Sequence, residues 1–147
     1  MFSLEIDLKL LEELNKKTLS NLKNKQQIEN KIGVVLLKNS KQSFPNQKSP
    51  EGKKWKRSTA AKKRKGLTLV DTGELSEGLE IKNVSSEIIG IVASDIADEY
   101  GYKHQFGGFI RTSDGDEIPL PPRPFAGLTE EGKKEVIKII IEGFFNA

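Results

Sequence analysis

Cysteine is absent from this chain of 147 residues, and histidine occurs only once, at His104. Without a thiol, the chain can form no disulfide bond, no thiolate nucleophile and no cysteine-ligated metal site. A single imidazole also cannot supply the several groups that a Ser-His-Asp site or a multi-histidine metal site needs. We therefore expect a protein that is not an enzyme, with no catalytic residue, no metal and no cofactor.

Long apolar stretches and a strong net charge are missing as well. No run of the sequence approaches the ~18 apolar residues that cross a bilayer, and the first residues lack the pattern of a secretory signal. We expect a soluble intracellular protein without membrane contact. The net charge is +3, from 24 basic and 21 acidic residues, so the overall charge argues little for a nucleic-acid partner.

The first part of the chain predicts one strand followed by two helices. Alternating apolar residues over 2–6 predict a short strand, and Asp7 is placed to cap a helix that runs to about residue 17. A second helix is expected over 19–40, although Gly33 inside it argues against an unbroken helix. Its predicted buried stripe consists of Ile28, Ile32, Val35 and Leu36.

Residues 42–66 have a different character and predict a long, basic, extended surface loop, with a helical turn around 59–65. Nine basic residues face a single acid, Glu51: Lys48, Lys53, Lys54, Lys56, Arg57, Lys62, Lys63, Arg64 and Lys65. Three interpretations stay open. The segment could bind phosphates while Trp55 stacks on a base, it could contact an acidic protein surface, or it could be a solvated loop without a binding role.

The second half of the chain predicts an antiparallel hairpin. Its apolar residues alternate on both sides of Ser85-Ser86: Leu79, Ile81 and Val84, then Ile89, Ile91 and Ala93. A short helix over 95–102, capped by Ser94 or Asp95, and a second long loop over 107–119 are expected to follow.

Four prolines between residues 119 and 124 then predict an extended segment. Thr129 is placed to cap a final helix, with Glu130 and Glu131 in its first turn. The apolar face of this helix consists of Val136, Ile139, Ile140 and Phe144. The whole pattern predicts a single α+β domain over 1–147, in which a long N-terminal helix and a C-terminal helix pack on a small antiparallel sheet.

Two features could be mistaken for reactive sites. No motif places a carboxylate and a nucleophile beside His104, so we expect a structural histidine at the end of a short helix. The stretch Asp71–Leu75 lacks the glycine spacing and the Lys-Ser/Thr end of a phosphate loop. Asp71 or Thr72 is instead expected to cap a turn of helix, with Leu75 and Leu79 packed inward.

Four short motifs together resemble a known protein family, whereas no single motif is specific enough to do so. They are Ser49–Trp55 (SPEGKKW), Leu69–Leu75 (LVDTGEL), Tyr100 with His104–Gly108 (HQFGG), and Ile118–Pro119 with Pro122–Phe125 (PRPF). In this order they resemble the phage virion morphogenesis family, which includes tail completion proteins and is related to head–tail connector and tail-terminator proteins. The resemblance covers residues 1–145. Departures occur at Gly101, where the family has a small alanine, and at Leu120 and Pro121, which lengthen the proline stretch.

The resemblance implies a non-enzymatic structural protein of the virion, at the junction of the tail and the neck, which resides in the host cytoplasm during assembly. It would complete or terminate the tail and join it to the head. Its expected partners are further copies of itself in a ring of six, tail tube or sheath proteins, and connector or neck proteins. DNA would be only the cargo in the lumen. The alternative is a nucleic-acid-binding module that uses the basic residues 48–65.

An assembly role needs surfaces that reach a neighbour, and the loops 42–66 and 107–119 could supply them. Arg123, held between prolines, is placed to be a fixed donor at an interface, to a carboxylate or a backbone carbonyl of the neighbour. The proline segment could equally just cover a sheet edge. The predicted interface residues are Trp55, Lys62, Lys63, Arg64, His104, Gln105, Phe106, Arg123 and Phe125.

Overall fold

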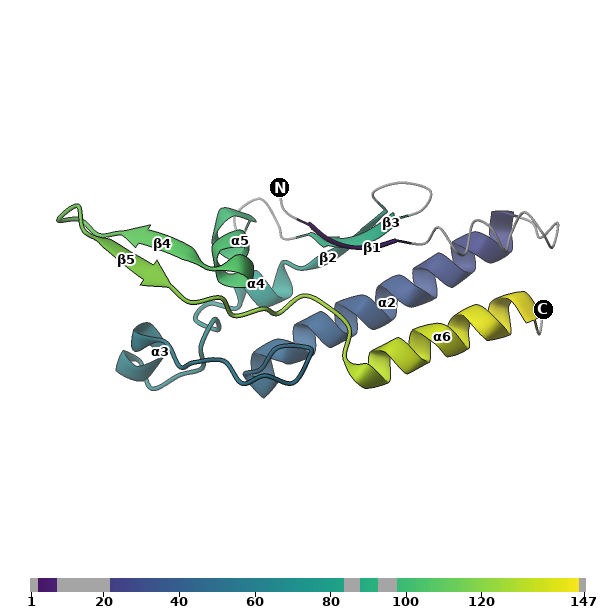
Figure 1. Cartoon of the computed structure of the whole chain (residues 1–147), viewed down its shortest axis with the longest axis horizontal. Helices are drawn as coiled ribbons and strands as arrows, with labels where there is room; N and C mark the ends of the chain where they lie inside the picture. Colours follow the sequence, from purple (N-terminus) through teal and green to yellow (C-terminus); the bar gives the residue numbers. More distant parts are fainter. Residues whose placement is uncertain (1–2, 8–21, 84–87, 93–97, 146–147) are drawn as a thin grey trace.

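The computed structural model describes residues 3–7, 22–83, 88–92 and 98–145 (Figure 1). The fold is α+β, as predicted, and its elements follow in this order: β1 (Ser3–Asp7), α2 (Leu22–Asn46), α3 (Thr59–Lys63), α4 (Glu74–Glu77), β2 (Glu80–Asn83), β3 (Ile88–Val92), α5 (Asp98–Phe106), β4 (Gly108–Arg111), β5 (Glu117–Leu120) and α6 (Glu130–Phe145). The helix predicted after Asp7 and the caps predicted at Ser94 or Asp95 lie outside the described residues.

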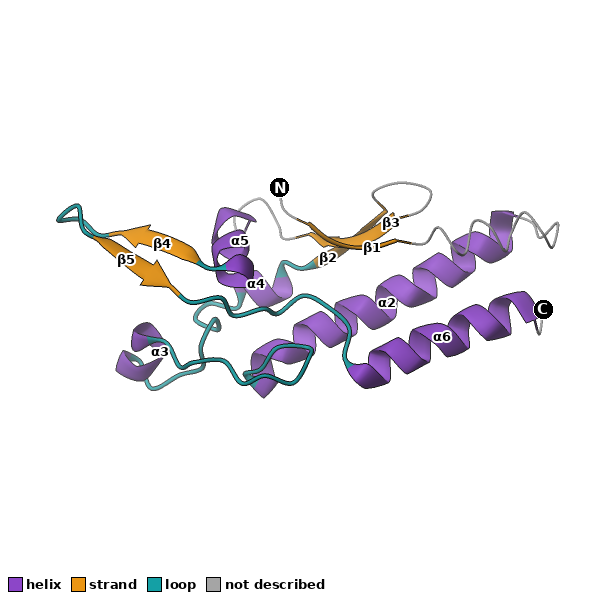
Figure 2. Ribbon diagram, viewed as in Figure 1, coloured by secondary structure: helices purple, strands orange, loops and turns teal. Residues whose placement is uncertain are grey.

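A three-stranded antiparallel sheet forms from distant parts of the chain, in the order β1-β3-β2. The predicted hairpin is confirmed as β2 and β3, with Ile81 opposite Ile91, and the predicted N-terminal strand is confirmed as β1, which pairs with the other edge of β3. In Figure 2 this sheet lies along one side of the long helix α2, and α6 lies along another side. The long helix is therefore the central element of this part of the fold.

Helix α2 is longer than predicted and is not interrupted at Gly33. A Cβ atom at Gly33 would lie 2.9 Å from Cγ2 of Ile81, so the glycine lets the helix approach the sheet closely. The helix also continues to Asn46, so the prediction of a loop from residue 42 was wrong for its first five residues. Burial of Phe44, which is 1% exposed, fixes this last turn, and Pro45 removes only one hydrogen bond from it.

Helix α6 begins as predicted, but it packs mainly along α2, where its predicted apolar residues Val136, Ile139 and Ile140 lie, and not on the sheet. Thr129 Oγ1 accepts a hydrogen bond from the Gly132 amide at 2.9 Å, which confirms the N-cap. Glycines on α6 also allow a close approach to α2. A side chain at Gly132 would collide with Asn39, and a side chain at Gly143 would collide with Ile28.

Among the residues whose burial the structure describes, the core consists of two apolar clusters. One surrounds Phe44 and Phe125, and Leu75 and Leu79 belong to it, as predicted. The other lies between α2 and α6 and consists of Ile28, Ile32, Val35 and Val136. The predicted buried stripe of α2 is thereby confirmed, including Leu36, which joins the first cluster.

The segment predicted as a second loop contains an antiparallel hairpin, β4–β5, in which Ile110 lies opposite Ile118. The prediction of a loop over 107–119 was therefore wrong in its central feature. Helix α5 ends at Phe106, later than the predicted residue 102, and the predicted residues 95–97 lie outside the described part of the chain. The sequence pattern did not predict this hairpin because its short strands do not have one buried apolar face. Thr112 donates its amide to the Asp116 carbonyl at 2.8 Å and closes the turn, in which Gly115 has a φ of +88°.

The short helices α3 and α4 lie where the sequence predicts helical turns. The predicted turn around 59–65 is α3, where Ser58 Oγ accepts from the Ala61 amide at 3.1 Å. The cap of α4 differs from the prediction because it is Gly73, with φ +84°, and not Asp71 or Thr72. Only glycine adopts this left-handed conformation without strain. Among the described residues, no helix is both long enough and apolar enough to cross a membrane.

Candidate assembly surface

The proline-rich segment 121–125 is hydrogen-bonded directly to residues 48–65, which we call the basic segment. Arg123 Nε donates to the carbonyl of Lys56 at 2.7 Å, and Trp55 Nε1 donates to the carbonyl of Pro124 at 2.9 Å. The Arg123 amide also donates to the carbonyl of His104 at 2.7 Å. Three segments that are distant in sequence are thus joined at one place, so the basic segment is held against the fold at residues 55–56.

Gln105 supports the same junction from inside. Its Oε1 accepts from the amides of Phe125 at 3.0 Å and Ala126 at 3.1 Å, and the side chain is only 6% exposed. The ring of Phe125 lies 5.3 Å from the ring of Phe44, which in turn meets Trp55 edge-on at 5.7 Å. The path of the proline segment is therefore fixed by buried hydrogen bonds and by aromatic packing.

His104 lies near the end of α5, as predicted for a structural histidine, and is buried. Burial, followed by the positive charge of Arg123, lowers the pKa of its imidazole to about 4. At neutral pH the side chain is therefore uncharged in the folded protein.

This shifted pKa predicts how stability depends on pH. Between pH 6.5, the ordinary pKa of histidine, and about 4, the unfolded chain binds a proton at His104 that the folded chain does not. The free energy of unfolding should therefore have its full His104 contribution above pH 6.5 and should decrease as the pH falls to about 4. Urea denaturation across this range measures the effect.

The matched control is His104→Gln, in which the carboxylates still titrate but the imidazole is gone. The decrease in stability between these two pH values should be smaller in this variant than in the unaltered protein. Parallel pH profiles would contradict the burial of a neutral imidazole.

All nine cations of the basic segment are exposed. Lys62 and Lys63 project from α3, whereas Arg64 is partly engaged, because its guanidinium donates to the carbonyl of Val70 at 3.1 Å and lies 3.7 Å from the Asp71 carboxylate. Trp55 is half-buried, and its indole N–H is already bonded. Stacking of a base on Trp55 and contact of the cations with an acidic surface therefore both stay predictions.

The hairpin β4–β5, residues 108–120, projects from one end of the molecule in Figure 1, and we call it the hairpin arm. Phe109 is 61% exposed, Ile110 is 45% exposed and Ile118 is 52% exposed. Because neighbouring residues of a strand point to opposite faces, both faces of the arm carry exposed apolar side chains. A two-stranded hairpin is marginally stable on its own in water, so such an arm suits a contact with another surface.

A groove of about 720 Å³ lies at the base of the arm. Its apolar wall includes Trp55, Phe106, Pro122 and Leu128, and Phe106 is 52% exposed. Its basic residues are Lys53, Lys54, Lys56 and Lys133, accompanied by Glu51. We call it the lysine-rimmed groove. An apolar wall with a cationic rim suits an apolar segment that carries negative charge.

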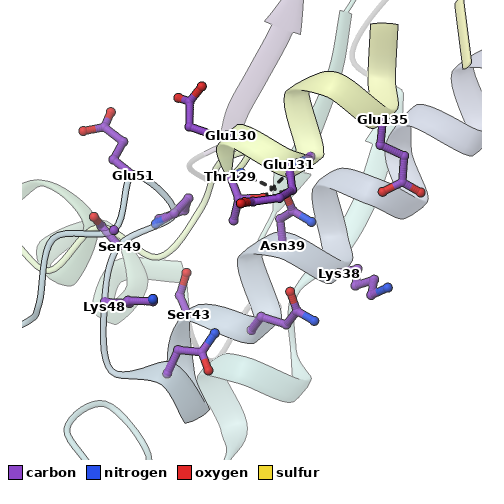
Figure 3. A pocket seen from close by; sticks show the side chains of 15 residues that line it. Lys38, Asn39, Ser43, Lys48, Ser49, Glu51, Thr129, Glu130, Glu131 and Glu135 are labelled. Atoms are coloured by element: carbon purple, nitrogen blue, oxygen red, sulfur yellow. Dashed lines mark hydrogen bonds between the residues drawn. The ribbon is translucent and has the colours of Figure 1, made fainter. Parts of the chain in front are cut away.

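A second hollow, of about 530 Å³, lies where α6 begins beside the end of α2 (Figure 3). Asn39 Oδ1 accepts from both the amide and the hydroxyl of Thr129, each at 2.9 Å. Glu130 and Glu131 lie in the first turn of α6, where the helix dipole favours negative charge. No group of three or more His, Cys, Asp or Glu side chains suited to a metal ion occurs among the described residues.

The structure divides the nine predicted interface residues into two groups. His104, Gln105, Arg123 and Phe125 are buried within the chain, and Trp55 is half-buried, so these five contribute to the junction described above. The exposed residues are Lys62, Lys63, Arg64 and Phe106. For these four, an interface role stays a prediction.

Sequence reasoning missed the apolar residues of the hairpin arm. Phe109 and Ile110 follow two glycines, and Ile118 follows a run of acidic and turn-forming residues, which predicted a loop. The available signal was the pair of short apolar groups on either side of Ser113-Asp114-Gly115, a spacing typical of a hairpin with a three-residue turn.

Comparison with known proteins shows which proteins this chain is similar to. The model of the phage virion morphogenesis family matches residues 6–144. A similar curated protein is Mu-like prophage FluMu G protein 1 of Haemophilus influenzae, which is 26% identical over 127 residues, covering 84% of this chain and 82% of that protein. No solved structure gives a significant match.

Proposed function

The chain belongs to the phage virion morphogenesis family, and from this membership we propose that it completes or terminates a phage tail and joins it to the head–neck region. It acts as a structural subunit, in a ring of identical copies, without catalysing a reaction. Its other partners are tail tube or sheath proteins and connector or neck proteins. Its place is the tail–neck region of the virion.

The exposed apolar hairpin arm is the observation that best supports this proposal. A subunit of a closed ring must present one surface that binds a different surface of the next subunit. The arm supports this part of the proposal, because Phe109, Ile110 and Ile118 remain exposed on its two faces. The resemblance to a protein of a Mu-like prophage supports the same class of role.

The basic segment supplies the second surface of the proposal. Lys62 and Lys63 lie on α3, away from the buried junction, and their charges are exposed. In a tail–neck junction such cations face either acidic protein surfaces or the DNA that passes through the lumen. Their role is electrostatic and needs no chemical step.

Charge reversal of α3 tests the proposal in particles. With Lys62→Glu and Lys63→Glu combined, joined virions should decrease on the order of tenfold or more, because like charges placed together at a contact cost over 1 kcal/mol. Unjoined heads and tails should accumulate, as counted by electron microscopy. Arg64 stays unchanged because its guanidinium bonds the backbone of residue 70.

The matched control reverses two exposed lysines elsewhere, Lys31→Glu and Lys134→Glu, with the same change in charge. These particles should join normally. Unaltered joining in the α3 variant, or a chain found in neither purified tails nor joined virions, would contradict the proposal.

The alternative function, a nucleic-acid-binding module, is favoured by one observation, the exposure of all nine cations between residues 48 and 65. It predicts that the purified chain retards DNA in a gel with a steep dependence on salt. Absence of retardation at moderate salt would exclude it.

A further inference from the structure

We propose that the hairpin arm of one copy of this chain binds in the lysine-rimmed groove of a second copy. This inference rests on the proposed ring, and it names the two surfaces that would form each contact. It follows from three features: the apolar side chains of both surfaces, their opposite charges, and the direction in which the arm extends.

The apolar parts of the two surfaces are complementary. The arm exposes an aromatic side chain, Phe109, and two isoleucines, Ile110 and Ile118. The groove offers a wall with the exposed ring of Phe106 and with Pro122. Aromatic side chains in contact with a rigid, proline-lined wall bury much area with little loss of side-chain freedom.

The charges of the two surfaces are opposite. Around its turn, the arm carries the carboxylates of Asp114, Asp116 and Glu117 and one cation, Arg111, which pairs with Glu117 at 3.4 Å. The groove has four lysines and one glutamate among its lining residues. Docking therefore brings a net negative tip to a net positive rim, which steers the two copies into one orientation.

The edge of β5 limits how the arm can associate. Thr112 and Asp116 form a hydrogen-bonded pair, and bonded and non-bonded pairs alternate along an antiparallel ladder. Phe109 and Pro119 are therefore a non-bonded pair, so the nitrogen of Pro119 lies at the outer edge of β5 and provides no donor there. The missing donor at Pro119 disfavours the addition of further strands to this edge, so docking through side chains is favoured.

The arm is not placed to fill the groove of its own chain. Phe106 and Pro121, which line the groove, lie just before and just after the arm in sequence, and the arm extends away from that point (Figure 1). Each strand spans roughly 13 Å, at about 3.3 Å per residue, so the tip lies well beyond its own groove. The proposed occupant of the groove is therefore the arm of another copy and not the arm of the same chain. Because arm and groove are different surfaces, each contact leaves one of each free, and the contacts can close into a ring.

Complementary charge reversal tests this docking directly. One variant carries Asp114→Lys and Asp116→Lys in the arm, and the other carries Lys53→Glu and Lys54→Glu in the groove. Each variant alone should self-associate at least about tenfold more weakly than the unaltered chain, since like charges then meet. An equimolar mixture should regain association, because arm and groove attract again at every contact of an alternating assembly.

Sedimentation of the purified chains measures the assembly, and the midpoint of thermal unfolding checks that each variant is folded. Three outcomes would overturn the proposal: an unaltered chain that stays monomeric at every concentration, variants that associate as well as the unaltered chain, or a mixture that does not recover. Either of the last two outcomes would mean that the arm binds a different protein or makes no contact.

Cross-linking gives an independent readout, because the chain has no cysteine of its own. A chain with Asp114→Cys and Lys53→Cys should form a ladder of disulfide-linked oligomers on oxidation. The matched control keeps Asp114→Cys and moves the second cysteine to Glu142 on α6, as Glu142→Cys, and it should give no ladder beyond a dimer. Equal ladders from both chains would contradict the docking.

These measurements also separate the inference from the proposed function. If the arm binds the groove in purified protein but the chain is absent from virions, the tail role fails and the docking stands. If the chain is present in virions and the charge-swapped mixture does not recover, the docking fails and the tail role stands.

Discussion

Replacing Phe125 by alanine should lower the free energy of unfolding by about 3–5 kcal/mol, the range typical of a fully buried phenylalanine. The Phe125 side chain is 0% exposed and contacts the ring of Phe44. Its removal leaves a cavity where α2, the basic segment and the proline segment meet. Urea denaturation at neutral pH measures the loss, with the midpoint of thermal unfolding as a second measure.

The matched control is Phe109→Ala, the same substitution at a phenylalanine that is 61% exposed on the hairpin arm. Its stability should change by no more than about 0.5 kcal/mol. Its self-association should weaken, since Phe109 is the largest apolar side chain of the arm. If both variants lose similar stability, the core does not centre on Phe125 as described.

Replacing Gln105 by leucine should lower the free energy of unfolding by about 2–4 kcal/mol. Leucine has a similar size but no acceptor, so the amides of Phe125 and Ala126 lose their common partner, Oε1 of Gln105. Each buried donor left without an acceptor costs about 1–3 kcal/mol. Denaturation by urea measures this change, and amide hydrogen exchange at residues 125 and 126 should become faster.

The control for this prediction is Gln27→Leu on α2, where the glutamine is exposed. Its effect should stay within about 0.5 kcal/mol. A Gln105→Leu variant that is as stable as this control would show that the two amides find another acceptor.

Patterns that repeat along a few turns or strand residues were predictable from the sequence. The apolar stripe with Ile32 and Leu36, the N-cap at Thr129 and the hairpin of β2 and β3 each depend on residues close together in the chain. Local periodicity and capping fix such features before any tertiary contact is known.

The end of α2 and the hairpin arm could not be predicted in the same way. The last turn of α2 is stabilised because Phe44 packs on Phe125, which lies 81 residues further along the chain. The arm lacks a buried face, so the alternation that identifies a strand, with apolar residues on one face only, is absent from it. In both cases the decisive contact, or its absence, is a tertiary property.

The candidate site shows the same distinction between features that the local sequence determines and features that depend on tertiary contacts. Exposure of Lys62 and Lys63 follows from composition, because charged residues in a basic run seldom pack inward. Arg123 is predicted to be a donor at an interface, whereas in the structure it is buried and donates to the carbonyl of Lys56 within the same chain. This partner lies 67 residues away, and no local pattern identifies it.

The bonds from Trp55 to Pro124 and from Arg123 to Lys56 also have a mechanical consequence. Tension on the hairpin arm enters the short segment 121–125, where the prolines leave little slack. From there it crosses these two hydrogen bonds into residues 55–56, and by way of Phe125 and Phe44 it reaches the C-terminal end of α2. The three-stranded sheet is not on this route, so the part of a load that enters through β5 reaches α2 without passing through the sheet, while β4 transmits the other part to α5.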